Sequence, residues 1–374
     1  MITVLLDKAE FEYDIHSLVK AFYPKEEVYV STKDKEKKEE PVHYHMDVQF
    51  APEEIIFSWK RVEASEDNAN QNGITKCVAV DYTNRKETKN SLKRTLYRLL
   101  SEYTGVELPW GNLTGIRPTK IPMALLEEGK SEEEIARYMK ETYFTSDEKI
   151  KLSIEIAERE LELLHKLDYE EGYSLYIGIP FCPTTCLYCS FTSYSMSAWK
   201  NRMDDYLSAL EKELDYTAVK FAHKKLNSIY IGGGTPTTLN PKQLDRLIRK
   251  IKCSFDLSDL VEFTVEAGRP DSITEEKLKV IKNHDITRIS INPQSMQQKT
   301  LDVIGRKHTV EEIKEAYALA RKTGFDNINM DIIAGLPGED ISDMEDTLAQ
   351  IAQMHPDSLT VHSLAIKRAA RLEI

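Results

Sequence analysis

Three cysteines within eight residues form a pattern that suits an iron–sulfur cluster. Cys182, Cys186 and Cys189 make a C-x3-C-x2-C run directly after an apolar stretch. Thiolates are soft ligands that suit iron–sulfur clusters, and a short loop lets neighbouring sulfurs bind one cubane. Three thiolates would bind three irons of a [4Fe–4S] cluster and leave the fourth open, as a catalytic zinc keeps one position open. The spacing therefore predicts a metal site that can bind and activate another molecule.

A zinc site and three unrelated thiols are the alternative interpretations of these cysteines. A zinc site usually has a second pair of Cys or His ligands at a matching spacing, and the sequence has none nearby. Unrelated thiols would rarely fall so close together in a chain with only five cysteines. The other two, Cys77 and Cys253, lie in ordinary apolar contexts, where we expect them to be buried.

The composition indicates an enzyme of a reducing compartment. The chain has 374 residues, enough for two domains with a core in each. An odd cysteine count, with three sulfurs assigned to metal, argues against a disulfide framework. The sequence shows neither a charged-then-apolar leader nor a long apolar run, so we expect a cytoplasmic protein without a membrane span. The net charge of −12 argues against a general affinity for nucleic acid.

The second half of the sequence alternates short apolar strands with amphipathic helices, which is typical of parallel βαβ units. Fewer strands are expected than the eight of a closed barrel, so this half is predicted to be an α/β fold of the partial (β/α)6 TIM type. The strands are expected at 175–181, 228–232, 262–266, 288–292, 327–333 and 358–363, and the helices at 204–221, 241–251, 275–282, 310–322 and 342–354.

The first half is predicted to be a smaller α+β domain at 1–168 that ends in a helical linker. The partial barrel is predicted to follow at 169–374. The segment 33–40 is almost wholly charged and is predicted to be a solvated loop. The segment 108–120, rich in Gly, Pro and Trp, is predicted to be a packed turn, with contact to a ligand as the alternative. Strands are expected at 2–6, 27–31, 43–50, 55–62 and 76–82, and helices at 91–104, 120–128, 132–142 and 146–167.

Distinctive residues follow the predicted strands of the second half. Ligands of such barrels gather at the carboxyl ends of the strands. A glycine triplet lets backbone approach a ligand closely, because glycine has no side chain. Taken together, these endings predict a cavity lined with hydrogen-bonding groups, with the metal site at one end. They are the cysteine run, Gly232-Gly-Gly-Thr-Pro-Thr237, Val265-Glu-Ala-Gly-Arg-Pro270, Asn292-Pro-Gln-Ser295 and Asp331-Ile-Ile-Ala-Gly-Leu-Pro-Gly338.

The cysteine run with Tyr188 before its last cysteine resembles the signature of the radical S-adenosylmethionine (SAM) enzymes. The strand-end motifs, together with Ile304-Gly-Arg-x-His308, narrow the resemblance to the oxygen-independent coproporphyrinogen III oxidase (dehydrogenase) family. The segment Trp110-Gly-Asn-Leu-Thr-Gly-Ile-Arg-Pro118 is similar to its HemZ-like branch. The resemblance covers about 171–365, and before that it rests on this one segment.

The resemblance implies a role for each matching position. The three cysteines would ligate three irons, and the amino and carboxylate groups of S-adenosylmethionine would chelate the fourth. For Arg306 and Asp331 a structural salt bridge is the alternative. The positions implied to contact S-adenosylmethionine are Tyr176, Tyr188, Gly233, Gly234, Thr235, Glu266, Gln294, Arg306, Asp331, Ile333 and Ala365.

The implied reaction is the oxidative decarboxylation of coproporphyrinogen III to protoporphyrinogen IX in heme biosynthesis. A 5′-deoxyadenosyl radical would take a hydrogen from each of two propionates, which become vinyl groups. An electron donor such as flavodoxin or ferredoxin would reduce the cluster. The resemblance assigns no protein residue to the chemical step, and Arg269 and Arg117 are candidates for holding the other carboxylates.

The sequence departs from the family at three places. Phe191 occupies the position of a fourth cysteine, a feature shared with relatives that are heme-binding chaperones. The motif at Asn292 differs from the more frequent Gly-Val-Gln. The family also continues into a helical C-terminal domain, so we expect this chain to be truncated before it. Three interpretations follow: the dehydrogenase, a heme-binding chaperone, and a radical enzyme that acts on another substrate.

Overall fold

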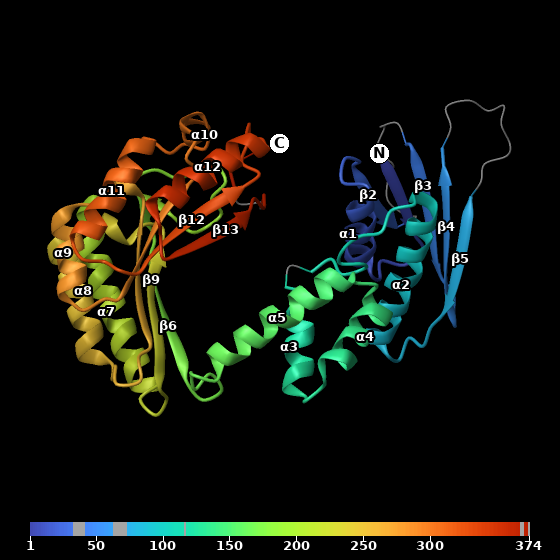
Figure 1. Ribbon diagram of the computed structural model, residues 1–374, viewed down its shortest axis with the longest axis horizontal. Helices are drawn as coiled ribbons and strands as arrows, with labels where there is room; N and C mark the ends of the chain where they lie inside the picture. The colour runs from blue at the N-terminus through green and yellow to red at the C-terminus, as the bar shows by residue number, and fades with distance from the viewer. Residues whose placement is uncertain (33–41, 63–72, 116, 367–369, 373–374) are drawn as a thin grey trace. The chain divides into compact units, whose positions relative to one another are not determined.

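The computed structural model describes residues 1–32, 42–62, 73–115, 117–366 and 370–372, so the loop predicted at 33–40 lies outside the described residues. The chain divides into two compact units, Met1–Leu164 and His165–Ile374. Figure 1 shows a sheet with helices in each unit. Among the described residues, no helix is long and apolar enough to cross a membrane.

A mixed five-stranded sheet forms the core of the first unit. Its strand order is β2-β1-β3-β4-β5, parallel on both sides of β1 and antiparallel from β3 to β5. Alternate side chains such as Val4, Val48 and Phe57 are buried in one core cluster with residues of α1 and α2. The elements are β1 Ile2–Leu6, α1 Glu12–Phe22, β2 Val28–Thr32, β3 Tyr44–Phe50, β4 Glu54–Arg61, β5 Ile74–Ala79 and α2 Arg85–Thr104.

Three further helices of the first unit, α3 Lys120–Glu127, α4 Glu132–Tyr143 and α5 Asp147–Leu164, share a second small core. The segment before α3 packs on the end of α4. Gly111 has a φ of 57°, and an added Cβ would lie 1.9 Å from the carbonyl oxygen of Tyr143. The Asn112 N–H donates to that same oxygen at 2.8 Å. These contacts fit a packed turn at this segment.

The second unit is an α/β domain built on an open sheet of six parallel strands, as the sequence predicts. The order β13-β12-β11-β10-β9-β6 leaves β6 and β13 at opposite edges. In Figure 1, α7, α8, α9 and α11 lie along one face of this sheet. The strands are β6 Tyr173–Ile179, β9 Leu226–Gly233, β10 Glu262–Gly268, β11 Arg288–Gln294, β12 Ile328–Ala334 and β13 Ser358–Ser363.

Several helices of the second unit begin at a residue whose side chain caps the first turn. Helix α8 starts with a capping box between Asn240 and Gln243 and has Pro241 in its first turn. It buries Leu244, Leu247, Ile248 and Ile251, which follow helical spacing. The helices are α7 Met203–Lys220, α8 Pro241–Ser254, α9 Glu275–Asn283, α11 Val310–Lys322 and α12 Ile341–Met354. Shorter elements are β7 Phe181–Cys182, β8 Tyr194–Ser195, α6 Met196–Trp199, α10 Gln298–Val303 and the 3-10 turns Lys200–Arg202, Pro236–Thr238 and Pro270–Ser272.

The prediction that Cys77 and Cys253 are buried is wrong, because both are exposed. Cys77 lies on the edge strand β5, where exposed and half-buried residues alternate along the strand. Cys253 lies in the last turn of α8, two positions after Ile251 and therefore off the buried face. An apolar sequence context did not reveal the face on which each thiol lies.

Candidate cofactor site at the carboxyl ends of the parallel strands

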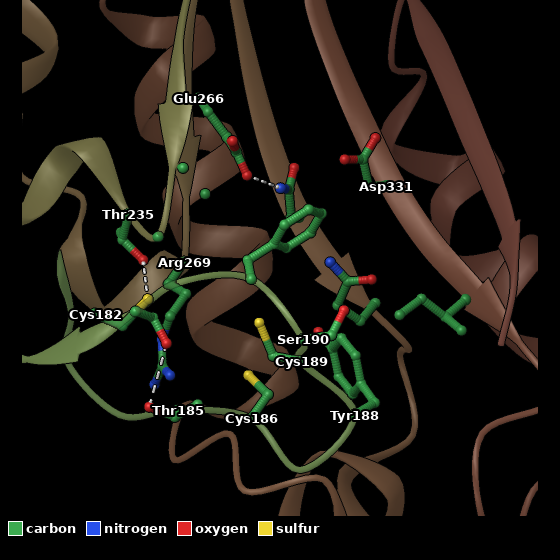
Figure 2. Close-up of a pocket in the computed structure, with 18 of the residues that line it drawn as sticks. Cys182, Thr185, Cys186, Tyr188, Cys189, Ser190, Thr235, Glu266, Arg269 and Asp331 are labelled. Carbon is green, nitrogen blue, oxygen red and sulfur yellow. Dashed lines mark hydrogen bonds between the residues drawn. The ribbon is translucent and has the colours of Figure 1, made fainter. Parts of the chain in front are cut away.

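A cavity of about 430 Å³ opens where the parallel strands of the second unit end. In Figure 2, Glu266 and Asp331 lie on one side of it and the cysteine loop on the other. All residues that the sequence assigns to cluster or cofactor binding line this cavity: Tyr176, Cys182, Cys186, Tyr188, Cys189, Gly233, Gly234, Thr235, Glu266, Gln294, Arg306, Asp331, Ile333 and Ala365.

The three cysteines offer a donor set that fits a cluster. Cys182 and Cys186 are buried and Cys189 is half-buried. Burial raises the pKa of the Cys182 and Cys189 thiols, and a bound metal is what would stabilise thiolates there. Within the described part of the chain, no three His, Cys, Asp or Glu side chains are placed to hold one metal ion. A cubane binds each thiolate through a different iron, so its ligands need not converge on one point.

The end of β9 packs closely against the start of the cysteine loop. Gly233 has a φ of 112°, in the region that favours glycine. An added Cβ on Gly234 would lie 2.9 Å from the sulfur of Cys182 and 2.8 Å from the carbonyl oxygen of Phe181. The buried hydroxyl of Thr235 donates to the Cys182 sulfur at 3.5 Å (Figure 2). The glycines are therefore needed for the loop and strand to meet.

Two carboxylates on the strands face the same cavity. Asn292 Nδ2 donates to Glu266 Oε1 at 2.7 Å, and the Tyr230 hydroxyl donates to Glu266 Oε2 at 3.5 Å. Burial, and after it the charge of Asp331, raise the pKa of Glu266 to about 7. Asp331 accepts a hydrogen bond from Asn329 Nδ2 at 2.6 Å. These oxygens are acceptors that a ligand with hydroxyl or ammonium groups can use.

Arg306 is buried, and it contacts two neutral oxygens of the protein. It donates to the carbonyl oxygen of Asn292 and, at 3.4 Å, to the hydroxyl of Tyr188. Within the described residues, Arg306 Nε and Gln294 Oε1 are buried without a hydrogen-bond partner. Gln294 also has a φ of 70°. Strained backbone and unpaired polar atoms gather at functional sites, so these two residues fit a ligand-binding wall.

Tyr230 is a cavity residue that the sequence analysis missed. Its ring stacks on that of Tyr176, with centroids 5.8 Å apart and planes 7° from parallel. Burial is the main cause that raises the pKa of Tyr230, and the neighbouring Glu266 contributes to the shift, so its hydroxyl stays protonated and remains a donor. The sequence did not reveal this residue, because Tyr230 is brought beside Tyr176 by the pairing of β9 with β6, which lies far from it along the chain.

The raised pKa of Glu266 generates a pH-dependent prediction for the cluster-free chain. In the folded state the pKa is about 7, above the ordinary value of 4.5, so the folded chain binds more protons between these values. Stability is therefore lost as the pH rises toward 7. Glu266→Gln is expected to raise the free energy of unfolding by roughly 1–3 kcal/mol at about pH 8 and to change it little at about pH 5.

Urea unfolding followed by circular dichroism measures this difference. Glu262→Gln, at the other end of β10, is the matched control for the loss of a carboxylate from the same strand. If Glu266→Gln changed the free energy of unfolding equally at both pH values, the raised pKa of Glu266 in the folded chain would be contradicted.

Residues 176–351 match the model of the radical SAM superfamily. The oxygen-independent coproporphyrinogen-III oxidase-like protein HemZ of Bacillus subtilis is 44% identical over 305 residues, 80% of this chain and 61% of the relative. The heme chaperone HemW of the same organism is 38% identical over 198 residues, 52% of this chain and 51% of the relative. The chain thus spans between half and two thirds of these relatives.

A solved structure is also similar to part of this chain. Coproporphyrinogen III oxidase HemN of Escherichia coli, described as a radical SAM enzyme, is 30% identical, with a TM-score of 0.49, over 54% of this chain and 48% of that chain. The match to the family model lies wholly within the unit that holds the cysteine loop. That unit therefore contains a radical SAM domain, and proteins of this superfamily use a [4Fe–4S] cluster and S-adenosylmethionine.

Proposed function

We propose that the chain acts in porphyrin biosynthesis as an oxygen-independent coproporphyrinogen III dehydrogenase. The observation that carries this proposal is the extent of the similarity to HemZ. That similarity spans 305 residues, more than the second unit, His165–Ile374, contains. The similarity to the HemW chaperone spans 198 residues, fewer than that unit contains. A first unit shared with the oxidase-like relative favours a common activity.

In this proposal Cys182, Cys186 and Cys189 ligate the cluster. When bound, the reduced cluster and S-adenosylmethionine supply a 5′-deoxyadenosyl radical that can remove a hydrogen atom from an unactivated carbon. The chain's own residues bind and orient the cofactor. The Gly233–Gly234 backbone lets a ligand approach closely because it carries no side chains, and the Glu266 and Asp331 oxygens accept from hydroxyl or ammonium groups.

The remaining cofactor positions supply shape and charge. Arg306 holds Tyr188 through its guanidinium and keeps a positive charge near the cysteine loop. Ile333, which is buried, and Ala365, which is exposed, are apolar residues of the cavity lining.

The proposed reaction converts propionate side chains of the substrate into vinyl groups. One hydrogen atom would pass from the β-carbon of a propionate to the 5′-deoxyadenosyl radical, giving 5′-deoxyadenosine, and the carboxylate would then leave as carbon dioxide. One electron passes from the substrate to a one-electron acceptor, and a vinyl group remains. Two propionates react in turn. A one-electron protein donor, such as flavodoxin or ferredoxin, would reduce the cluster before each turnover.

Anaerobic turnover tests the function directly. The reconstituted chain would be mixed with dithionite, S-adenosylmethionine and coproporphyrinogen III, and mass spectrometry would follow 5′-deoxyadenosine and the loss of carbon dioxide from the porphyrinogen. Both products are expected, and Cys186→Ala should abolish both because it removes a cluster ligand. Deoxyadenosine without change in the porphyrinogen would point to another substrate.

A heme-binding chaperone is the second candidate, and Phe191 is the observation that favours it. Its side chain lines the cavity and is 72% exposed. An exposed aromatic ring beside the cofactor can stack on a planar macrocycle. A heme titration of the reconstituted chain distinguishes the two functions. A stoichiometric heme complex that Phe191→Ala weakens, without porphyrinogen turnover, would overturn the dehydrogenase proposal.

The contact between Thr235 and Cys182 generates a prediction for the cluster's reduction potential. A hydrogen bond to a ligating sulfur stabilises the more negative, reduced cluster. Thr235→Val is expected to lower the potential by roughly 20–60 mV, the equivalent of one net hydrogen bond in a one-electron couple. A redox titration followed by electron paramagnetic resonance (EPR) measures the shift. Thr235→Ser keeps the hydroxyl and should stay near the wild-type value, whereas equal shifts in both variants would exclude the hydroxyl as the cause.

A further inference from the structure

Arg269 follows β10, and only 4% of its side chain is exposed. Its guanidinium forms a two-pronged ion pair with Asp271: Nε donates to Oδ1 at 3.0 Å and Nη2 donates to Oδ2 at 2.7 Å. A planar, bidentate pair of this kind fixes the orientation of the guanidinium. The pair thereby directs the third nitrogen, Nη1, toward a single partner.

That partner is Thr184, which lies between the first two cysteines of the run. Arg269 Nη1 donates to the carbonyl oxygen of Thr184 at 3.0 Å and to its hydroxyl oxygen at 2.6 Å. The Thr184 hydroxyl in turn donates to the carbonyl oxygen of Gly305 at 3.3 Å. Nearby, the Leu187 N–H donates to the carbonyl oxygen of Ile304 at 3.0 Å. The cysteine loop is thus tied to the end of β10 and to the segment 304–305.

These contacts conflict with the sequence-based suggestion that Arg269 holds a substrate carboxylate. Each of its three nitrogens already donates to a protein oxygen, and its charge is paired with Asp271. A substrate carboxylate would have to displace Asp271 or Thr184 from a guanidinium that is itself buried. Loss of either contact would leave this buried charge with fewer partners, which is costly.

We propose that Arg269 is a positioning residue for the iron–sulfur cluster. Its ion pair with Asp271 fixes the guanidinium, which holds Thr184 and thereby the path of the loop from Cys182 to Cys186. Because Arg269 lies three residues after Glu266, the same contact couples the cluster loop to the strand that carries a cofactor-facing carboxylate. The inference rests on the proposed assignment of the three cysteines as cluster ligands.

Release of iron from the reconstituted chain tests the inference. Arg269→Gln, Asp271→Asn and the wild type would be mixed anaerobically with a ferrous chelator, and the rate of iron release would be followed by absorbance. Outer-shell partners of metal ligands typically change metal affinity at least tenfold when lost, so Arg269→Gln is expected to release iron about tenfold faster. Asp271→Asn should fall between it and the wild type.

Arg246 offers a matched control, because it forms an equally two-pronged pair with Glu211 between α8 and α7. It does not line the cavity. Arg246→Gln should release iron at the wild-type rate. Equal acceleration in Arg246→Gln and Arg269→Gln would overturn the inference, because loss of any structural ion pair would then have the same effect.

Thr184 supplies a second, independent measurement. Thr184→Val removes the hydroxyl without touching the ion pair, and it should release iron faster than Thr184→Ser. The double variant Arg269→Gln, Thr184→Val should release iron more slowly than the two single effects combined would give, since both changes remove the contact between Arg269 and the Thr184 hydroxyl. Additive rates would contradict the proposal. If Arg269→Gln fails to fold, the comparison of iron release between Thr184→Val and Thr184→Ser tests the proposal instead.

Two readouts separate this inference from the function on which it rests. A wild-type chain that takes up no [4Fe–4S] cluster would refute the cysteine assignment itself. Where the wild type does take up the cluster, the EPR signal of the reduced cluster should change when S-adenosylmethionine is added, and this change should be reduced in Arg269→Gln but not in Arg246→Gln. An unaltered change in Arg269→Gln, together with wild-type iron release, would refute the positioning role alone.

Discussion

The parallel pairing of the second sheet is the constraint on which the whole site depends. The six strands run in one direction, so their carboxyl ends meet at one edge. The cysteine loop, the glycine segment and the carboxylates each follow or end a different strand, and only this pairing brings them around one cavity. An antiparallel strand would place its end at the opposite edge and remove its residues from the site.

The two buried arginines of the cavity make hydrogen bonds that position the cysteine loop. Arg269 is paired with Asp271 and holds Thr184, while Arg306 holds Tyr188. Burial, and after it the charge of Arg306, lower the pKa of the neighbouring His308 to about 4, so this imidazole adds no positive charge near neutral pH. Both arginines that line the cavity are thus engaged with protein oxygens, whereas Glu266 and Asp331 keep oxygens toward the cavity.

Much of this architecture could be predicted because local signals agree with it. Buried strands alternate with capped helices, and the polar residues after each strand share one edge of the sheet. Helix α1 was missed although Ile15, Leu18 and Phe22 follow helical spacing, because its N-cap, Phe11, lacks a capping side chain. The role of Arg269 could not be predicted, because its partner Thr184 lies 85 residues away and only the fold brings them together.

The cofactor of this site is better defined than its substrate. Cluster and cofactor positions are read from backbone geometry and a few strand-end residues that the family shares. A substrate is recognised by the groups that face it across the cavity. The similar proteins illustrate this, since one is described as oxidase-like and another as a heme chaperone. One fold supports several functions. Similarity at the cofactor site therefore identifies the chemistry that is available, whereas the residues that contact the substrate determine which molecule reacts.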